Sequence, residues 1–358
     1  MSRIIVSRNL LTNFRIINRA KFVEVARMQQ NNANYSEYAC KSMVDMDHIQ
    51  KLRNLEEINP DTYRANFFGA RPASARGSGV GENIYGGLLF AQAMLAAENT
   101  VDSQFEPHAI HAFFTLNGTP DKPIDYKVER IRDGRSFINR SVKACQNGNV
   151  VFTAQTSLCK KEPPSIEHQQ EMPKVPQPDQ VKPYFHEARR FLHENESGVR
   201  KLEDFQVKSL QRKIDEDEPC CVFEFRPIEP TKFMSLESWK PQPMCYWMRT
   251  VLPIPSDEQQ LHRFLVTYIT DATLVSAANT PHMSHSYRPS MLFTLDHTVH
   301  FHDHNYRADE WLLYENLSRV AKNGRGFSEG RVWTQDGRLV ISTSQESLSR
   351  TKTEPSKL

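Results

Sequence analysis

The strongest constraint on the fold of this chain is an internal repeat, because the same pair of motifs occurs twice at the same spacing. "DGRSF" at 133–137 is followed by "TAQTS" at 153–157, and "NGRGF" at 323–327 is followed by "TSQES" at 343–347. In both copies, 19 residues separate the glycine of the first motif from the first threonine of the second. A matched spacing of this kind favours a duplicated domain over two unrelated hairpins.

Each copy of the repeat also predicts the same order of secondary structure. The turns "QNGN" and "QDGR" lie between the paired motifs, and Asn-Gly or Asp-Gly between β-forming residues is a strong hairpin signal. Further upstream, each copy has a helical pattern and then a strand with a central histidine. These helices are expected at 86–101 and 260–278, and the strands at 108–116 and 291–301. The predicted fold class is therefore α+β, with one long helix packed on an antiparallel sheet in each half.

The domain organisation follows from where the repeat begins and ends. A stretch rich in Pro, Gln and charge, "KKEPPSIEHQQEMPKVPQPDQVKP", separates the two copies and is typical of a linker. The expected parts are a basic leader (1–47), an N-terminal domain (48–160), a linker with a short helix (161–216), a C-terminal domain (217–350) and a tail (351–358).

Composition narrows the function classes. A chain of 358 residues that is 39% hydrophobic can bury a large core, and a net charge of +2 gives no reason to expect a nucleic-acid partner. No apolar run reaches the roughly 18 residues of a membrane span, so we expect no such span and a soluble protein. The six cysteines form no CxxC pair and no secretory signal precedes them, which favours reduced thiols inside the cell.

The two ends of the sequence suggest different compartments. Ser356-Lys357-Leu358 is a tripeptide that a peroxisomal import receptor recognises, and it predicts the peroxisomal matrix. The first 23 residues contain five Arg and Lys residues and no acid, as a mitochondrial transit peptide does. Peroxisomal localisation is the primary expectation, and mitochondrial targeting is the alternative.

Familiar catalytic and cofactor motifs are missing from the sequence. There is no GxSxG, and no cysteine lies in a catalytic signature. The glycine-rich "GSGVGENIYGG" at 77–87 lacks the preceding strand and the spacing of a dinucleotide site, and is interpreted as a loop. Four histidines crowd together at positions 297, 300, 302 and 304, but no Cys or Glu nearby completes a metal site. We expect no metal and no other cofactor.

Polar residues on faces that should be buried are better candidates. Asp271 continues the apolar stripe of the second helix, since positions 264, 268, 271 and 275 advance by 4, 3 and 4. A carboxylate there is costly unless something pairs with it or uses it. Gln345 likewise extends the apolar face that Leu339 and Ile341 begin in the last strand. In "MLFTLDHTVHF", simple alternation places Thr294 and Asp296 on one face and His297 on the other. Each of these residues, taken alone, also fits a structural role.

Several long, ordered motifs resemble the type II acyl-CoA thioesterases. These motifs are "IYGGLLFAQAMLAA", "YITDATLV", "LFTLDHTVHFH", "EWLLYE" and "GRGFSEGRVWTQDGRLVISTSQE", and the resemblance covers roughly residues 50–350. It implies a tandem double-hotdog fold, in which each half is a long helix wrapped by an antiparallel sheet. It also implies acyl-CoA substrates, hydrolysis through a water molecule, and a catalytic trio that carries over to Asp271, Thr294 and Gln345. Assembly into a homo-oligomer is a further expectation from the resemblance.

The sequence departs from the family in places, and it leaves some alternatives open. Leu88 follows the two glycines where the family usually has glutamine, and 72–81 looks like an insertion. Substrate contacts are expected at Gly87 and at three cations beside the repeated glycine turns, namely Arg135, Lys322 and Arg325. A hotdog-type enoyl-CoA hydratase and a non-catalytic acyl-CoA-binding protein remain alternative functions.

Overall fold

The computed structural model describes residues 41–69, 83–237, 240–283 and 287–351. These residues belong to one compact unit that begins at Lys41. Most of the basic leader, the expected insertion at 72–81 and the C-terminal Ser-Lys-Leu lie outside the described residues.

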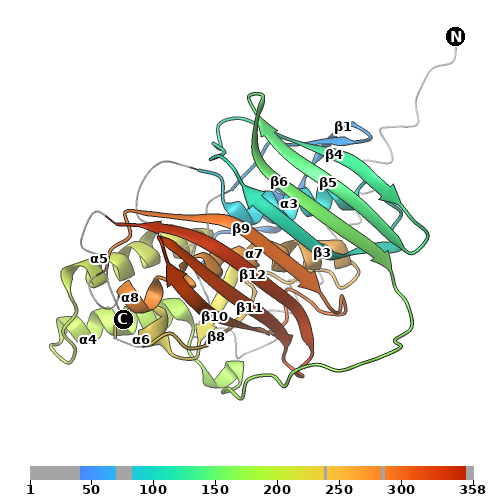
Figure 1. Ribbon diagram of the computed structural model, residues 1–358. Helices are drawn as coiled ribbons and strands as arrows, with labels where there is room; N and C mark the ends of the chain where they lie inside the picture. The colour runs from blue at the N-terminus through green and yellow to red at the C-terminus, as the bar shows by residue number, and fades with distance from the viewer. Residues whose placement is uncertain (1–40, 70–82, 238–239, 284–286, 352–358) are drawn as a thin grey trace, which may run out of the picture. The chain divides into compact units, whose positions relative to one another are not determined.

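One antiparallel sheet of 12 strands organises the described part of the chain (Figure 1). The strands are β1 (Glu56–Asn59), β2 (Thr62–Ala65), β3 (Phe105–Phe114), β4 (Ile124–Asp133), β5 (Phe137–Gln146) and β6 (Asn149–Lys160) in the N-terminal half, and β7 (Phe223–Pro227), β8 (Met244–Thr250), β9 (Met291–Phe301), β10 (Leu312–Lys322), β11 (Arg325–Thr334) and β12 (Leu339–Arg350) in the C-terminal half. Their order is β1-β2-β4-β5-β6-β3-β9-β12-β11-β10-β8-β7. The two halves therefore join at β3 and β9, where Ile110 lies opposite Val299.

The hairpins form where the Asn-Gly and Asp-Gly signals predict them. Asn147 and Gly148, with φ of 51° and 80°, connect β5 to β6, and the Asp336-Gly337 turn, with Gly337 at φ of 92°, connects β11 to β12. A further Asn-Gly turn, Asn323 and Gly324 with φ of 55° and 72°, connects β10 to β11. Two successive residues with positive φ match the right-handed twist of the flanking strands, and Asn and Gly adopt that conformation most easily. The repeat also extends to the sheet register. Tyr63 lies opposite Tyr126 in the first half, and Tyr246 lies opposite Tyr314 in the second.

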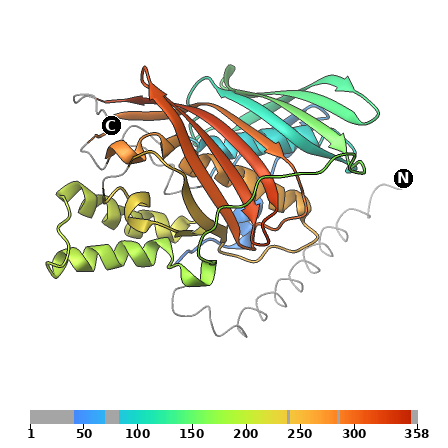
Figure 2. The same cartoon turned by 60° about the horizontal axis from the view of Figure 1, so that its bottom comes forward.

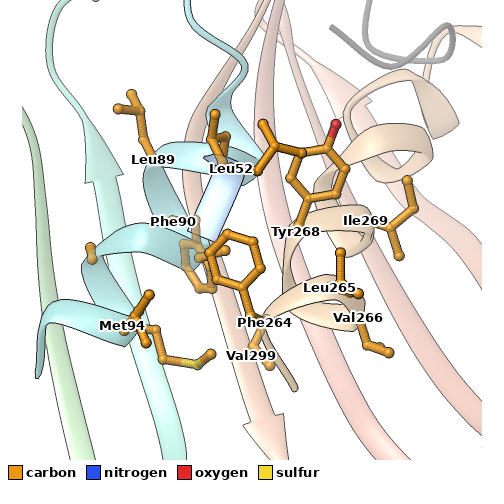
Figure 3. Packing of buried hydrophobic residues seen from close by; sticks show 14 of the residues in the cluster. Leu52, Leu89, Phe90, Met94, Phe264, Leu265, Val266, Tyr268, Ile269 and Val299 are labelled. Atoms are coloured by element: carbon orange, nitrogen blue, oxygen red, sulfur yellow. The ribbon is translucent and has the colours of Figure 1, made fainter. Parts of the chain in front are cut away.

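Two helices lie side by side against one face of the sheet. They are α3 (Gly86–Glu98) and α7 (Gln259–Ala277), and nearly every residue of both is buried. Figure 3 shows Phe90 and Met94 of α3 and Phe264 of α7 turned toward the space between the two helices. A helix that is apolar almost all round belongs in a core, so each half has its long helix inside the sheet, and the expected α+β double-hotdog architecture is confirmed. None of the described helices is both long and apolar enough to cross a membrane.

The segment expected to be a linker packs on the C-terminal half. It contains two helices where one was expected, α4 (Tyr184–Glu196) and α5 (Asp204–Arg212), which lie beside that half of the sheet (Figure 2). Before them, the Gln169 side chain donates a hydrogen bond to Gly337 O, and Trp247 Nε1 donates one to Pro176 O. The other described α-helices are α2 (Met46–Arg53), α6 (Pro230–Phe233) and α8 (Thr280–Met283).

Candidate active site

The three side chains that the sequence singled out meet between α7 and the sheet. Thr294 Oγ1 donates a hydrogen bond to Asp271 Oδ1 at 2.9 Å. Gln345 Nε2 donates to the same Asp271 oxygen at 2.8 Å and to Thr294 Oγ1 at 2.7 Å. Asp271 is 3% exposed and Gln345 is 1% exposed. A buried carboxylate is thus held by a hydroxyl and an amide, which fixes its orientation.

A β-bulge in β9 turns Thr294 toward the helix. In the pairing with β12, Asp296 lies opposite Glu346 and Thr294 lies opposite Ser347, so β9 contributes one extra residue at this point. An extra residue reverses the alternation of side chains. Thr294 and His297 therefore both reach α7, although simple alternation predicted opposite faces for them. The predicted alternation was wrong at this point in the strand.

The first turn of α3 lies against this carboxylate because its first two residues are glycines. A Cβ added to Gly86 would lie 2.9 Å from Phe114 Cε1 and 3.1 Å from Asp271 Oδ2. A Cβ added to Gly87 would lie 2.3 Å from the backbone oxygen of Tyr268. The first backbone N–H groups of a helix have no acceptor within the helix and carry the positive end of its dipole. The glycines thus allow an electropositive helix end to approach Asp271 closely.

A cavity of about 640 Å³ opens onto Asp271 and Thr294. Its wall is largely apolar around these two residues, with Leu89, Phe114 and Leu292 among the contributors. The start of α3 also lines it, through Tyr85 and Gly86, and so do parts of α5 and of the loop before β9. A volume of this size is typical of a small-molecule site.

Two tyrosine phenols lie close enough to Asp271 for its charge to affect their pKa. Burial and the Asp271 carboxylate raise the pKa of Tyr85 well above its usual range, and Tyr85 donates its hydroxyl proton to Tyr268 O at 2.8 Å. Burial also raises the pKa of Tyr314, with Asp271 adding to the effect, and Tyr314 donates to Thr270 O. Both phenols are therefore neutral donors. Asp271 is the only carboxylate among the described residues that line the cavity.

His297 and Asp296 do not form an acid–base pair. His297 is fully buried, contacts Thr270 Oγ1 through Nε2 at 3.0 Å and packs on Phe90. Burial lowers its pKa to about 3, so the imidazole is neutral at ordinary pH. Asp296 instead accepts a hydrogen bond from the backbone N–H of Glu346 at 2.7 Å. The two residues are committed to different neighbours.

The remaining sequence-predicted residues lie elsewhere in the fold. Arg135, Lys322 and Arg325 are exposed, Arg325 pairs with Glu346, and none of the three is among the described residues that line the cavity. Leu88, where the family usually has glutamine, is fully buried in the core and likewise does not line the cavity. In the described part of the chain, no group of three or more His, Cys, Asp or Glu side chains is arranged to hold a metal ion.

Sequence reasoning missed the cations that do reach the cavity. These are Lys208 and Arg212 of α5, Lys213 directly after it, and Arg288 in the loop before β9. Residues 205, 208, 209 and 212 follow one helical face, and this spacing was the signal that could have marked the segment as part of a site.

The fold and the site together define a double-hotdog protein with a buried Asp–Thr–Gln cluster at the wall of a ligand-sized cavity. Comparison with known proteins agrees with this class. The family models described as the acyl-CoA thioesterase N-terminal domain and the acyl-CoA thioesterase C-terminal domain match residues 74–159 and 208–349. The chain belongs to the type II acyl-CoA thioesterase family, whose members are thioester hydrolases.

Individual relatives cover most of the chain. Acyl-coenzyme A thioesterase 8 of Mus musculus is 33% identical over 304 residues, which are 85% of this chain and 89% of that protein. Acyl-CoA thioesterase 2 of Haemophilus influenzae is 30% identical over 274 residues, 75% and 87% of the two chains. The solved structure of an acyl-CoA thioesterase II from Mycobacterium marinum superposes with a TM-score of 0.63 at 28% identity, and covers 85% of this chain and 99% of that one.

Proposed function

We propose that this protein hydrolyses fatty acyl-CoA thioesters to a free fatty acid and CoA, with Asp271 as the general base. The single observation that carries the proposal is the hydrogen-bonded cluster of Asp271, Thr294 and Gln345 at the wall of the cavity. The family relationship supports the substrate class, because the relatives are named as acyl-CoA thioesterases.

The first chemical step is addition of water to the thioester carbonyl. Asp271 accepts a proton from the water as its oxygen bonds to the carbonyl carbon, which gives a tetrahedral intermediate with a negative oxygen. The N–H groups at the start of α3, at Gly86 and Gly87, are the proposed donors to that oxygen, because a helix N-terminus stabilises negative charge. The carbon–sulfur bond then breaks, and the proton held by Asp271 passes to the CoA sulfur.

Thr294 and Gln345 would position the base. Both donate hydrogen bonds to one Asp271 oxygen, so the carboxylate cannot rotate freely in the cavity wall. Positioning of this kind contributes several kcal/mol to lowering a barrier by fixing the reacting groups in the right geometry. Neither residue needs to exchange a proton with the substrate in this scheme.

Two other functions fit the observations less well. A hydratase of this fold would need an acid–base pair, and the adjacent Asp296 and His297 point to different neighbours. A non-catalytic binding protein would have no need to keep a buried carboxylate oriented by two donors, because a buried charge of this kind costs stability. An assay that follows both free CoA and the acyl double bond separates these functions from hydrolysis. Release of free CoA with no change at the double bond indicates hydrolysis.

The cellular role is proposed to be peroxisomal lipid metabolism. One relative, 25% identical over 345 residues, is named peroxisomal acyl-coenzyme A thioester hydrolase 1 of Saccharomyces cerevisiae. Ser356-Lys357-Leu358 is the proposed address for the peroxisomal import receptor, and the basic leader is the competing mitochondrial signal. Fluorescent fusions with and without the tripeptide test this proposal. Removing the tripeptide should abolish the peroxisomal signal. A mitochondrial signal that is the same with and without the tripeptide would contradict the proposal.

The test of the activity is thiol release from a panel of acyl-CoAs of different chain length. Wild-type protein should release CoA, and Asp271→Asn, which keeps the shape but removes the base, should lower kcat by about 10²- to 10⁴-fold. The thermal unfolding midpoints of both proteins should be compared as a control for folding. An Asp271→Asn variant that folds normally and keeps its kcat would show that Asp271 is not the base.

A further inference from the structure

We propose that one wall of the cavity, formed by α5 and the loop before β9, binds the phosphate groups of the substrate's nucleotide portion. The residues are Lys208, Arg212, Lys213 and Arg288, and together they are called the basic wall. This inference rests on the proposed hydrolase function, because it assigns the subsite for the part of the CoA thioester that does not react.

The basic wall is a built face of α5 rather than a scatter of surface charge. Phe205, Lys208, Ser209 and Arg212 all line the cavity, and their spacing places them on one side of the helix. The other side of α5 is anchored: Leu210 is buried and Gln206 Nε2 donates to Ser235 O at 3.0 Å. Because the buried side fixes the rotation of the helix, the cations are held toward the cavity.

The charge of the cavity wall is strongly one-sided. Its described lining residues include four cations and a single carboxylate, Asp271. None of the four cations forms a salt bridge with another described residue, whereas exposed arginines elsewhere do, as Arg319 does with Glu329 and Arg325 does with Glu346. Cations gathered at a cavity without salt-bridge partners favour an anionic ligand there.

Arg288 joins the loop to α5. Its guanidinium donates hydrogen bonds to Met283 O and Tyr287 O, and its Cζ lies 3.2 Å from the centre of the Phe205 ring. An arginine stacked on an aromatic ring is pre-organised, so it loses less freedom when it binds a phosphate than a mobile side chain does. The half-buried Arg288 is therefore the fixed point of the basic wall, and the more exposed Lys208 and Arg212 complete it.

A CoA thioester matches this arrangement of charge. Its thioester end is uncharged, whereas its nucleotide end carries a diphosphate and a phosphate on the ribose. One continuous cavity contains the Asp271 cluster for the first and the basic wall for the second. A thioester without the nucleotide, such as an S-acyl-N-acetylcysteamine, would react at Asp271 but make no contact with the basic wall.

The experiment compares these two kinds of thioester. The double variant Lys208→Gln/Arg212→Gln should raise KM for acyl-CoA about tenfold or more, since each charge-assisted contact contributes about as much as a tenfold change in affinity. The ratio of kcat/KM for acyl-CoA to kcat/KM for the acyl-N-acetylcysteamine should fall by the same factor. Inhibition by adenosine 3′,5′-bisphosphate should weaken in parallel. Lys127→Gln/Lys143→Gln, two exposed lysines on β4 and β5, is the matched control.

The outcomes separate this inference from the proposed function. If the double variant loses the same activity on both thioesters, or if the control changes KM equally, the basic wall does not bind the phosphates. If wild-type protein hydrolyses neither thioester, the hydrolase function fails, and binding of adenosine 3′,5′-bisphosphate then decides the subsite alone. Weaker binding by the double variant would support the basic wall, and equal binding would overturn it.

Discussion

The central strands of the two halves can be compared residue by residue. β3 and β9 each have two histidines three residues apart, His108 and His111 in β3 and His297 and His300 in β9. The rings of His111 and His300 meet edge to face, 5.3 Å apart, where the strands pair. His108 is half-buried, whereas His297 is fully buried. Both strands have a bulge, but at different places relative to the histidines: in β3 it falls at His108 itself, between Pro107 and Ala109, whereas in β9 it falls before His297, between Thr294 and Asp296. The same spacing of histidines thus lies at different depths in the two halves.

The comparison continues at the positions before the histidines. Three residues before His297, β9 has Thr294, which donates to Asp271. Three residues before His108, β3 has Phe105, which packs with Ile138 and Leu158 in a small apolar cluster. A duplicated scaffold needs apolar residues in both copies, but the proposed chemistry needs the polar set in only one. The polar side chains of the candidate site, Asp271, Thr294 and Gln345, therefore occur in the C-terminal half only.

The opposite end of the helix pair has polar residues of another kind. Where α3 ends and α7 begins, Arg263 donates to Glu98 at 2.7–2.8 Å and to Glu106 at 3.3 Å. Burial raises the pKa of Glu98, although the charge of Arg263 opposes the effect. Arg263 and Glu98 are both less than a tenth exposed. One end of the helix pair thus holds a carboxylate beside a cavity, and the other end holds a carboxylate neutralised by a cation.

The ion pair at that end should matter for stability and not for catalysis. Arg263→Met leaves Glu98 buried without its partner, and we expect a loss of about 3–5 kcal/mol in the free energy of unfolding. Adding Glu98→Leu should restore most of the loss, because the buried charge is then removed as well. Urea denaturation measures both variants, and kcat of the folded protein should stay within about twofold. An Arg263→Met variant as stable as wild type would contradict this account.

The paired histidines should differ in how they respond to acid. The pKa of His297 is about 3 in the folded protein, whereas its ordinary value is 6.5. The neutral, buried His297 therefore leaves the folded state fully stable above about pH 6.5, and the free energy of unfolding decreases as the pH falls from there toward 3. The expected loss is about 1.4 kcal/mol per pH unit, or about 3 kcal/mol by pH 4. His297→Leu should flatten the pH dependence of unfolding over this range. His108→Leu should change it much less, and equal effects would show that the two sites are equally buried.

The smallest effect in this series concerns the glutamine at the third position of each repeated motif. Gln155 of "TAQTS" is exposed, whereas Gln345 of "TSQES" is buried and donates to Asp271 and Thr294. Gln345→Leu should lower kcat about tenfold or more, since two buried acceptors lose a donor. Gln155→Leu should leave kcat within about twofold. Steady-state kinetics on one acyl-CoA decides this, and equal kcat values for the two variants would break the asymmetry proposed for the halves.

Much of the fold could be predicted because its signals are local or periodic. The Asn-Gly turns, the two helices and the repeat spacing all follow from residue type and period, and the structure contains them. Asp271 and Gln345 could be found for the same reason, since each interrupts an apolar face with a polar residue.

Other features had no such signal. The bulge at Thr294 depends on how β9 pairs with β12, and no glycine or proline marks it in the sequence. Lys208, Arg212 and Lys213 of the basic wall were missed because the composition of 161–216 is that of a linker, although α5 packs against the C-terminal half. Arg135, Lys322 and Arg325 were chosen for their nearness to glycine turns, and nearness in sequence did not place them at the cavity.

The central claim is that Asp271 activates water and does not itself attack the thioester. A single turnover of acyl-CoA by excess enzyme in ¹⁸O-labelled water tests this directly. The account predicts one ¹⁸O atom in the fatty acid from the first turnover, and no label in the protein. An unlabelled fatty acid, with ¹⁸O in the peptide that contains Asp271, would show that the carboxylate attacks the substrate and would contradict the account.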